Sequence, residues 1–173
     1  HETGELVFDD CRVPVDNLIG QEGEGLTQIL ATLRSGRLSY GARATGIAQA
    51  AYEAAFRYAQ ERVQFGRPIA KFQVNTFKLV DMAIAVDIMR IMTYRAAWLF
   101  DQGRDCMKEA CMVKLFATEA LQKVVNDAMQ IHGGYGYTME YPVQRYWRDA
   151  RLLTITEGTS EIQHLAIARE LGI

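Results

Sequence analysis

The spacing of its prolines is the feature that most limits what this chain can fold into. Only three occur in 173 residues, Pro14, Pro68 and Pro142. A proline inside a helix removes a backbone hydrogen bond and clashes with the preceding turn, so long helices form where proline is absent. Apolar residues recur at helical spacing in those stretches, first over residues 25–63. The sequence therefore predicts a helical protein.

Five helices are expected from this periodicity. Three are long, at about 25–63, 72–101 and 107–132, a short one follows Pro142, and the last starts near residue 160 and runs almost to the end of the chain. Long helices joined by short connections pack as antiparallel neighbours. The predicted fold class is all-α, an antiparallel four-helix-type bundle with an extra short C-terminal helix.

The second expected helix carries two apolar stripes. A helix that is apolar around most of its circumference is covered on several sides. In a chain of this length, that favours a bundle interior on one side and a subunit interface on another. One stripe contains Phe77, Val80 and Ile84, and the other contains Leu79, Ala83 and Val86.

Three glycines, Gly36, Gly41 and Gly46, lie inside the first expected helix. Each costs about 1 kcal/mol of helix stability relative to alanine. Their presence predicts that another backbone or a ligand comes close at these positions.

Residues 5–15 (ELVFDDCRVPV) have the pattern of a β element with no partner strand in view. An isolated strand is not stable by itself. We therefore expect a remnant β-strand before the bundle, in a chain that begins as if cut from a longer protein.

Charge and composition exclude several classes of function. The formal net charge is −2 and the isoelectric point about 6.0, so a nucleic acid or an anionic membrane is not expected as a partner. The three cysteines lack CxxC spacing and the three histidines lie far apart, so we expect no disulfide framework and no metal site. Charged residues interrupt the longest apolar stretch, 80–100, so no membrane span is expected. The composition fits a soluble protein of a reducing cytosol or organelle matrix.

The segment RVQFGRPIAKFQ, residues 62–73, joins two expected helices and can hold a phosphate group. The N–H groups at a helix start favour an anion, and Arg62 or Arg67 can add charge-assisted hydrogen bonds. The alternative is a plain helix–turn connection in which Gly-Arg-Pro is ordinary turn chemistry. Local chemistry leaves both interpretations open.

The segment QIHGGYGY, residues 130–137, ends the third expected helix. Gly133 is placed to end it with a positive φ angle, which does not account for Gly134 and Gly136. Paired glycines let a backbone approach a ligand closely, and the tyrosines offer flat surfaces for stacking. His132 alone is interpreted as a structural histidine.

The segment ITEGTSEIQ, residues 155–163, precedes the last expected helix, with Thr159 and Ser160 as favourable N-cap residues. Glu157 is either a surface carboxylate near a helix start or a general base on a short loop. In the second case, Gly158 gives the loop freedom and nearby N–H groups bind an oxyanion, as proton removal next to a carbonyl requires. The residues alone leave both roles open.

Together these segments resemble the acyl-CoA dehydrogenase family. RVQFGRPIAKFQ, QIHGGYGYTMEYPVQRYWRDARL and ITEGTSEIQHLAIAREL occur in the order and spacing of that family's C-terminal helical domain, over nearly all of the chain. The resemblance implies that residues 1–20 are the end of a middle β domain and residues 21–173 the C-terminal helical bundle. It also implies an N-terminal helical domain and most of a β domain that this chain lacks.

The resemblance implies an FAD cofactor and assigns roles to single positions. Glu157 matches the catalytic base, whose backbone N–H would help to polarise the thioester carbonyl. Contacts with the acyl-CoA substrate are implied for Arg37, Gly158 and Arg169. Contacts with FAD are implied for Arg62, Gln64, Phe65, Gln73, Gln130, Ile131, His132, Gly133, Gly134, Thr159 and Glu161. The segments 62–65 and 130–134 would come from a neighbouring subunit.

Three positions depart from the common family pattern. Gly36 occupies the position, one before Arg37, at which some members carry the base instead, and this favours Glu157. Thr156 stands where many members have tyrosine, which changes the pocket and leaves the acyl group open. Glu161 stands where many members have an amide.

The implied reaction converts an acyl-CoA thioester to a trans-2-enoyl-CoA, with Glu157 taking the α-proton and electron-transfer flavoprotein as the expected partner. The implied assembly is a homo-oligomer, dimer or tetramer, that shares its FAD site between subunits in a bacterial cytoplasm or a mitochondrial matrix. The alternatives are an acyl-CoA oxidase-like enzyme and a non-catalytic oligomerisation bundle. Without the other domains, this chain alone is expected to be inactive and to bind flavin weakly.

Overall fold

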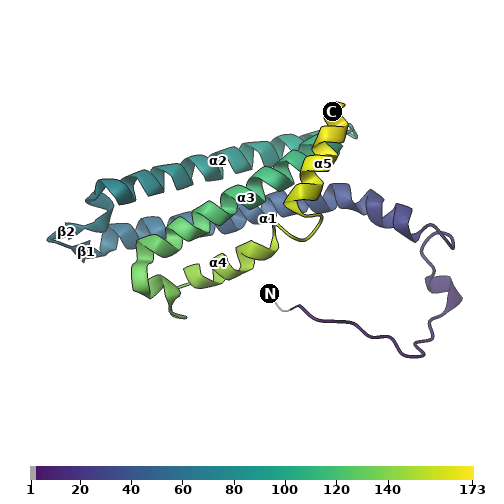
Figure 1. Ribbon diagram of the computed structural model, residues 1–173, viewed down its shortest axis with the longest axis horizontal. Coiled ribbons are helices and arrows are strands. Elements are labelled where there is room, and N and C mark those ends of the chain that lie inside the picture. The colour runs from purple at the N-terminus through teal and green to yellow at the C-terminus, as the bar shows by residue number, and fades with distance from the viewer. Residues whose placement is uncertain (1–2) are drawn as a thin grey trace.

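The computed structural model describes residues 3–173. Three long helices lie side by side, α1 (Gly25–Glu61), α2 (Gln73–Asp101) and α3 (Met107–His132), followed by α4 (Val143–Leu152) and α5 (Ser160–Leu171). In Figure 1, α1 to α4 alternate in direction and α5 packs on α3 near the start of that helix. The all-α prediction is confirmed, and the bounds of the three long helices lie within two residues of those expected.

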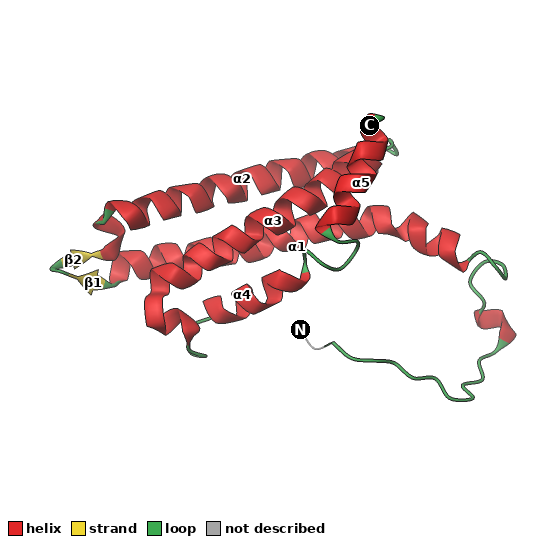
Figure 2. Cartoon of the chain, in the orientation of Figure 1, coloured by secondary structure: helices red, strands yellow, loops and turns green. Residues whose placement is uncertain are grey.

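Short elements complete the connections. Val63–Gln64 (β1) and Arg67–Pro68 (β2) pair antiparallel as a hairpin between α1 and α2, drawn in yellow in Figure 2. The 3-10 turns are η1 (Val15–Asn17), η2 (Ile69–Lys71) and η3 (Gly133–Tyr137). The helical periodicity did not predict this hairpin, because two-residue strands are too short to show a period.

Residues 5–15 form no strand, so the expected remnant β-strand is absent from the fold. They run as an exposed segment beside the bundle (Figure 1), and the leading side chains Leu6, Val7 and Phe8 are each more than three-quarters exposed. Within residues 3–173 no strand pairs with this segment. A strand needs such a partner for its backbone hydrogen bonds, which is the physical reason for the difference.

Small side chains let α1 and α3 approach closely. Gly41 lies at this contact, where an added Cβ would sit 2.1 Å from Val113 Cγ1. Gly46 has no atom within 4 Å of an added Cβ, so the close approach expected there does not occur. The stripe of fully buried alanines that continues from Gly41 consists of Ala44, Ala48, Ala51, Ala55 and Ala59.

The two apolar stripes of α2 have different environments. Leu79 and Val86 are buried in the core, whereas Phe77, Val80 and Ile84 are each more than half exposed. An apolar stripe left on the surface is typical of an interaction site. Within residues 3–173, none of the helices combines the length and the hydrophobicity of a membrane-spanning segment.

Candidate functional site

Glu157 lies on the loop that joins α4 to α5, and its carboxylate packs against the backbone of α1. At Gly36 of α1, an added Cβ would lie 2.5 Å from Glu157 Oε2. Any larger side chain at Gly36 would therefore displace the carboxylate. This contact explains one glycine that the sequence singled out, and it turns Glu157 towards the bundle.

The backbone of this loop adopts a rare conformation. Glu157 has a φ angle of 58° and Gly158 one of 88°. A non-glycine residue in the left-handed region costs about 1–3 kcal/mol and persists only where its surroundings hold it there. Such residues concentrate at functional sites.

Two fully buried side chains hold the loop from the interior. Lys114 of α3 donates from Nζ to the carbonyl oxygen of Gly158 at 2.7 Å and lies 3.4 Å from that of Thr154. Gln163 of α5 donates from Nε2 to the carbonyl oxygens of Glu157 and Gly158, both at 3.0 Å. The loop carbonyls are thus tied to two different helices.

A second buried cation lies at the same end of the bundle. The guanidinium of Arg37 contacts Met107 Sδ at 2.9 Å and Cys111 Sγ at 3.2 Å, and its Nε has no hydrogen-bond partner in the described residues. Within residues 3–173, no carboxylate lies within ion-pair distance of Arg37 or Lys114. Buried charges are normally paired, so this end of the bundle favours an anion.

The remaining contacts fix the ends of the loop. Thr156 Oγ1 lies 2.8 Å from Tyr40 Oη on α1, and Thr159 Oγ1 caps α5 by accepting from the N–H of Ile162 at 3.4 Å.

Glu161 is exposed in the first turn of α5, and a hydrogen bond from its own N–H lowers its pKa. Arg169 lies apart from the loop, exposed in the last turn of α5.

The other sequence-predicted residues gather at the opposite end of the bundle. The hairpin turns at Phe65 and Gly66, with φ angles of 51° and 78°, the signs that a type I′ turn requires. Phe65 is 92% exposed, and the guanidinium of Arg62 lies 5.5 Å from the centre of the Tyr135 ring. A surface hollow of about 500 Å³ is lined by Tyr58, Arg62, Gln64, Ile69, Ile131, His132, Gly133, Gly134, Tyr135 and Thr138.

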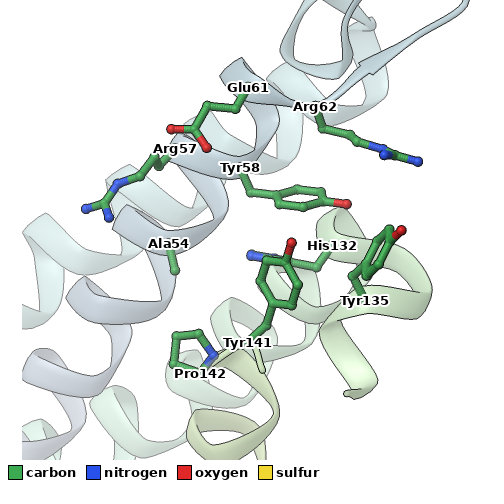
Figure 3. Close-up of a pocket in the computed structure, with 9 residues that line it drawn as sticks. All are labelled: Ala54, Arg57, Tyr58, Glu61, Arg62, His132, Tyr135, Tyr141 and Pro142. Atoms are coloured by element: carbon green, nitrogen blue, oxygen red, sulfur yellow. The ribbon is translucent and has the colours of Figure 1, made fainter. Parts of the chain in front are cut away.

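His132 lines this hollow and belongs to an aromatic cluster that also lines a neighbouring pocket, drawn in Figure 3. Its ring stacks on Tyr58 with centroids 4.3 Å apart, and its Nδ1 lies 2.8 Å from the carbonyl oxygen of Ala128. Burial lowers the pKa of His132. The side chain of His132 is thus held by stacking and by one contact with the backbone, and Ile131 is buried as well.

The exposed residues at the hairpin end of the bundle are accessible to a ligand. Gly133 has a φ angle of 61°, and nothing lies within 4 Å of an added Cβ at Gly133 or Gly134. Gln64, Gln73 and Gln130 are exposed at the same end. The structure thus brings the hairpin and the glycine-rich turn together, although 60 or more residues separate them in sequence.

The residues around Glu157 and the residues at the hairpin end do not meet in one copy of the chain. Gly36, which touches Glu157, and Arg62 lie 26 residues apart in sequence, and α1 is continuous between Gly36 and Glu61. At 1.5 Å per residue, the separation is about 39 Å. Glu157 and Arg62 therefore lie at opposite ends of the bundle.

No sequence motif pointed to Lys114, which lies on α3, far in sequence from the peptide stretch 154–159 that it holds. Gln163 ends the segment 155–163, but the motif assigned it no role. A signal was present at Lys114, because the residue shares a helical stripe with the apolar Ala110 and Ala117. Lysine is rarely found at such core positions unless it has a specific partner.

Comparison with known proteins identifies the family of the chain. The family model described as acyl-CoA dehydrogenase, C-terminal domain, matches residues 23–172. The probable acyl-CoA dehydrogenase YngJ of Bacillus subtilis (strain 168) is 53% identical over 169 residues, which cover 98% of this chain and 44% of that protein. The chain thus spans less than half the length of this relative.

Solved structures share the fold. Butyryl-CoA dehydrogenase from Megasphaera elsdenii superposes with a TM-score of 0.91 at 41% identity, covering 96% of this chain and 44% of that one. A structure of PigA with FAD and proline superposes with a TM-score of 0.88 at 32% identity, covering 95% of this chain and 43% of that one. From the match of the family model and these similarities, the chain belongs to the acyl-CoA dehydrogenase family.

Proposed function

We propose that this chain is the C-terminal domain of a flavin-dependent acyl-CoA dehydrogenase, with residues 1–20 ending a middle β domain and residues 21–173 forming the helical bundle. The longer protein would convert an acyl-CoA thioester to a trans-2-enoyl-CoA. The observation that carries the proposal is the carboxylate of Glu157, held against Gly36 on a loop of rare conformation beside two unpaired buried cations.

Glu157 is the base in this proposal. Its carboxylate takes the α-proton, while its backbone N–H and that of Gly158 donate to the thioester oxygen, on which negative charge develops. The positive charges of Arg37 and Lys114 favour an anion at this end of the bundle, both as the ionised base and as the enolate-like oxygen. Arg169 would contact the CoA portion farther along α5.

The hairpin end fits the phosphates and the adenine of FAD. Arg62 supplies charge, Gly133 and Gly134 leave open space for a close backbone approach, and the exposed ring of Phe65 offers a stacking surface. Exposed amides at Gln64, Gln73 and Gln130 add hydrogen-bonding groups. The similarity to PigA, whose solved structure contains FAD, supports this assignment. When bound, FAD supplies the acceptor for the β-hydride, and these residues bind and orient it.

The separation of about 39 Å between Gly36 and Arg62 along α1 supports a site shared between subunits. Thr159 and Glu161, next to Glu157, would face the FAD of their own subunit, whereas the hairpin and residues 130–134 would reach the FAD of a neighbour. The exposed apolar stripe of α2 supports a homo-oligomer, dimer or tetramer. Electron-transfer flavoprotein is the proposed electron acceptor, in a bacterial cytoplasm or a mitochondrial matrix.

A panel of acyl-CoA thioesters of increasing chain length tests this function in the full-length enzyme. We expect anaerobic bleaching of the flavin by at least one thioester, and butyryl-CoA is the first to try because of the similarity to butyryl-CoA dehydrogenase. Oxygen consumption measured in parallel distinguishes a dehydrogenase from an oxidase. If no thioester bleaches the flavin, the proposed enzymatic function is wrong and the non-catalytic oligomerisation bundle is the remaining interpretation.

The chain by itself is expected to be inactive, since most of its flavin and substrate contacts would lie in the absent domains or in a second subunit. Purified alone, it should assemble through its bundle without stoichiometric flavin. A yellow protein carrying one flavin per chain contradicts this part of the proposal.

A further inference from the structure

We propose that Lys114 is a positioning residue for Glu157, which holds the base's loop in shape and keeps a positive charge beside its carboxylate. This inference deepens the function proposed above and rests on it. Lys114 touches neither the substrate nor the flavin, and acts through the loop that it holds and through its charge.

The first observation is where the ammonium group lies. The side chain of Lys114 is 0% exposed and extends from α3 to the inner side of the loop. Its Nζ lies 2.7 Å from the carbonyl oxygen of Gly158 and 3.4 Å from that of Thr154. One acceptor precedes Glu157 in the chain and the other follows it, so a single cation bridges the two sides of the loop.

The second observation is that Lys114 shares this task with a neutral group. Gln163 donates to the carbonyl oxygens of Glu157 and Gly158, and the N–H of Ser160 donates to the carbonyl oxygen of Thr154 at 3.2 Å. These contacts hold the loop's shape without any charge. The sequence nevertheless places a lysine at this buried position, where an ammonium group loses its hydration at a cost. A role in holding shape alone does not account for the choice of lysine.

The third observation is the set of charges that faces Lys114. Burial lowers its pKa, and the carboxylates of Glu119, Glu157 and Glu161 oppose that shift, whereas Arg37 adds to it. Glu119 accepts a hydrogen bond from Ser160, and Glu161 is exposed. Glu157 is thus the loop carboxylate on which a protonated Lys114 would act. A nearby cation favours the ionised form of a carboxyl, which is the form that a base requires.

The alternative is a lysine that merely fills the core and finds two carbonyl acceptors. The two roles differ in what they predict for Lys114→Met, a change that keeps an unbranched apolar side chain of similar length. A filling role predicts altered stability only. A positioning role predicts slower proton removal and an altered pH dependence in protein that is folded and carries flavin.

The experiment uses the full-length enzyme with Lys114→Met and, as matched control, Lys123→Met. Lys123 lies on the same helix, nine residues farther along, and pairs with Asp81 and Asp127 away from the loop. Flavin content, melting temperature, the flavin reduction rate at saturating acyl-CoA and the pH profile of kcat/KM are measured for both variants and the wild type. Gln163→Leu is added to report how much the neutral contact contributes.

For Lys114→Met we expect the flavin reduction rate to fall about 10²-fold, the loss that a small misplacement of a reacting group produces. Flavin content stays near that of the wild type, and the acidic limb of the pH profile moves to higher pH because the cation is gone. Lys123→Met keeps the wild-type rate and profile. A Lys114→Met enzyme with the wild-type rate and profile overturns the proposal. So does a rate that falls only in proportion to flavin content, with an unchanged profile.

Failure of the proposed function is a separate result. If no acyl-CoA bleaches the wild-type flavin, Glu157 is not a base, and the part of the inference that concerns its charge is overturned with it. Amide hydrogen exchange over residues 154–160 then tests whether Lys114 stabilises the conformation of the loop. Faster exchange in Lys114→Met than in Lys123→Met supports it, and equal exchange overturns it.

Discussion

The two ends of the bundle are built in opposite ways. At the α4–α5 end, the polar groups Lys114 and Gln163 are fully buried and hold one loop, while Gly36 leaves room for a single carboxylate. At the hairpin end, the side chains of Arg62 and Phe65 are exposed and make few contacts within the chain. The difference teaches that the proposed base is held by the chain's own side chains. The opposite end leaves its groups exposed, as a ligand site would require.

The largest expected effect comes from removing the base itself. In the full-length enzyme, Glu157→Gln should slow flavin reduction by acyl-CoA about 10³- to 10⁴-fold, the upper part of the range for a general base. Bound flavin should be retained, because the residues that bind its phosphates lie at the other end. Glu170→Gln, on the exposed end of α5, is the control and should keep the wild-type rate. Rapid bleaching in Glu157→Gln would remove the assignment of this residue.

A smaller but more specific effect is expected at Gly36. In Gly36→Ala, the new Cβ would lie 2.5 Å from Glu157 Oε2, so the carboxylate must move and flavin reduction should slow about 10²-fold. Gly46→Ala is the matched control in the same helix, since nothing lies within 4 Å of its added Cβ. It should keep the rate and stabilise the domain by up to about 1 kcal/mol. Equal rates in the two variants would show that the contact at Gly36 does not position the base.

At the hairpin end, a change at Arg62 should affect FAD binding and not the reduction rate. Arg62→Ala should weaken FAD binding about tenfold, or about 1.4 kcal/mol, through loss of a charge-assisted contact with phosphate. The flavin reduction rate of the fully loaded enzyme should stay unchanged, because Glu157 is held independently. Titration with FAD measures the first quantity and stopped-flow absorbance the second. Arg104→Ala, in the connection between α2 and α3, should change neither. A slower rate in saturated Arg62→Ala would mean that the two ends are coupled.

The smallest expected effect is the pH dependence of stability at the hairpin end. Burial lowers the pKa of His132, so the unfolded chain takes up a proton before the folded chain does. Stability should therefore begin to fall as the pH drops through about 6.5, the ordinary value for histidine, and fall further until the lowered pKa is reached. Urea unfolding at pH 7.5 and 5.5 measures this loss, and His132→Gln should reduce it by up to about 1 kcal/mol. An unchanged pH slope in His132→Gln would assign the loss to other groups.

The long helices could be predicted from the sequence because their apolar spacing repeats over many turns. The hairpin could not, since its strands contain two residues each and its turn depends on Phe65 adopting a positive φ angle that no local preference for phenylalanine favours. Residues 5–15 show the opposite case, in which a strand-like pattern forms no strand because no partner pairs with it.

The candidate site was predictable only where a motif carries the chemistry. The segments that contain Glu157 and Arg62 were identified from their residues and from the family they resemble. Lys114 was not, because only tertiary packing brings it to the loop from α3. Gln163 lies in an identified segment, but its contact with the loop carbonyls was not predicted. Gly36 was noticed as a costly glycine, but the carboxylate that occupies its open side is 121 residues away in sequence.

The measurement that tests the account most directly combines the two ends in one oligomer. Copies carrying Glu157→Gln are mixed with copies carrying Arg62→Ala and Phe65→Ala, and the subunits are exchanged at an FAD concentration too low to load the second variant alone. In a shared site, each mixed pair regains one intact site, with the base from one copy and the hairpin from the other. We predict flavin reduction well above that of either parent. If the mixture shows only the sum of its parents' rates, both ends serve a site within one copy, and the account is contradicted.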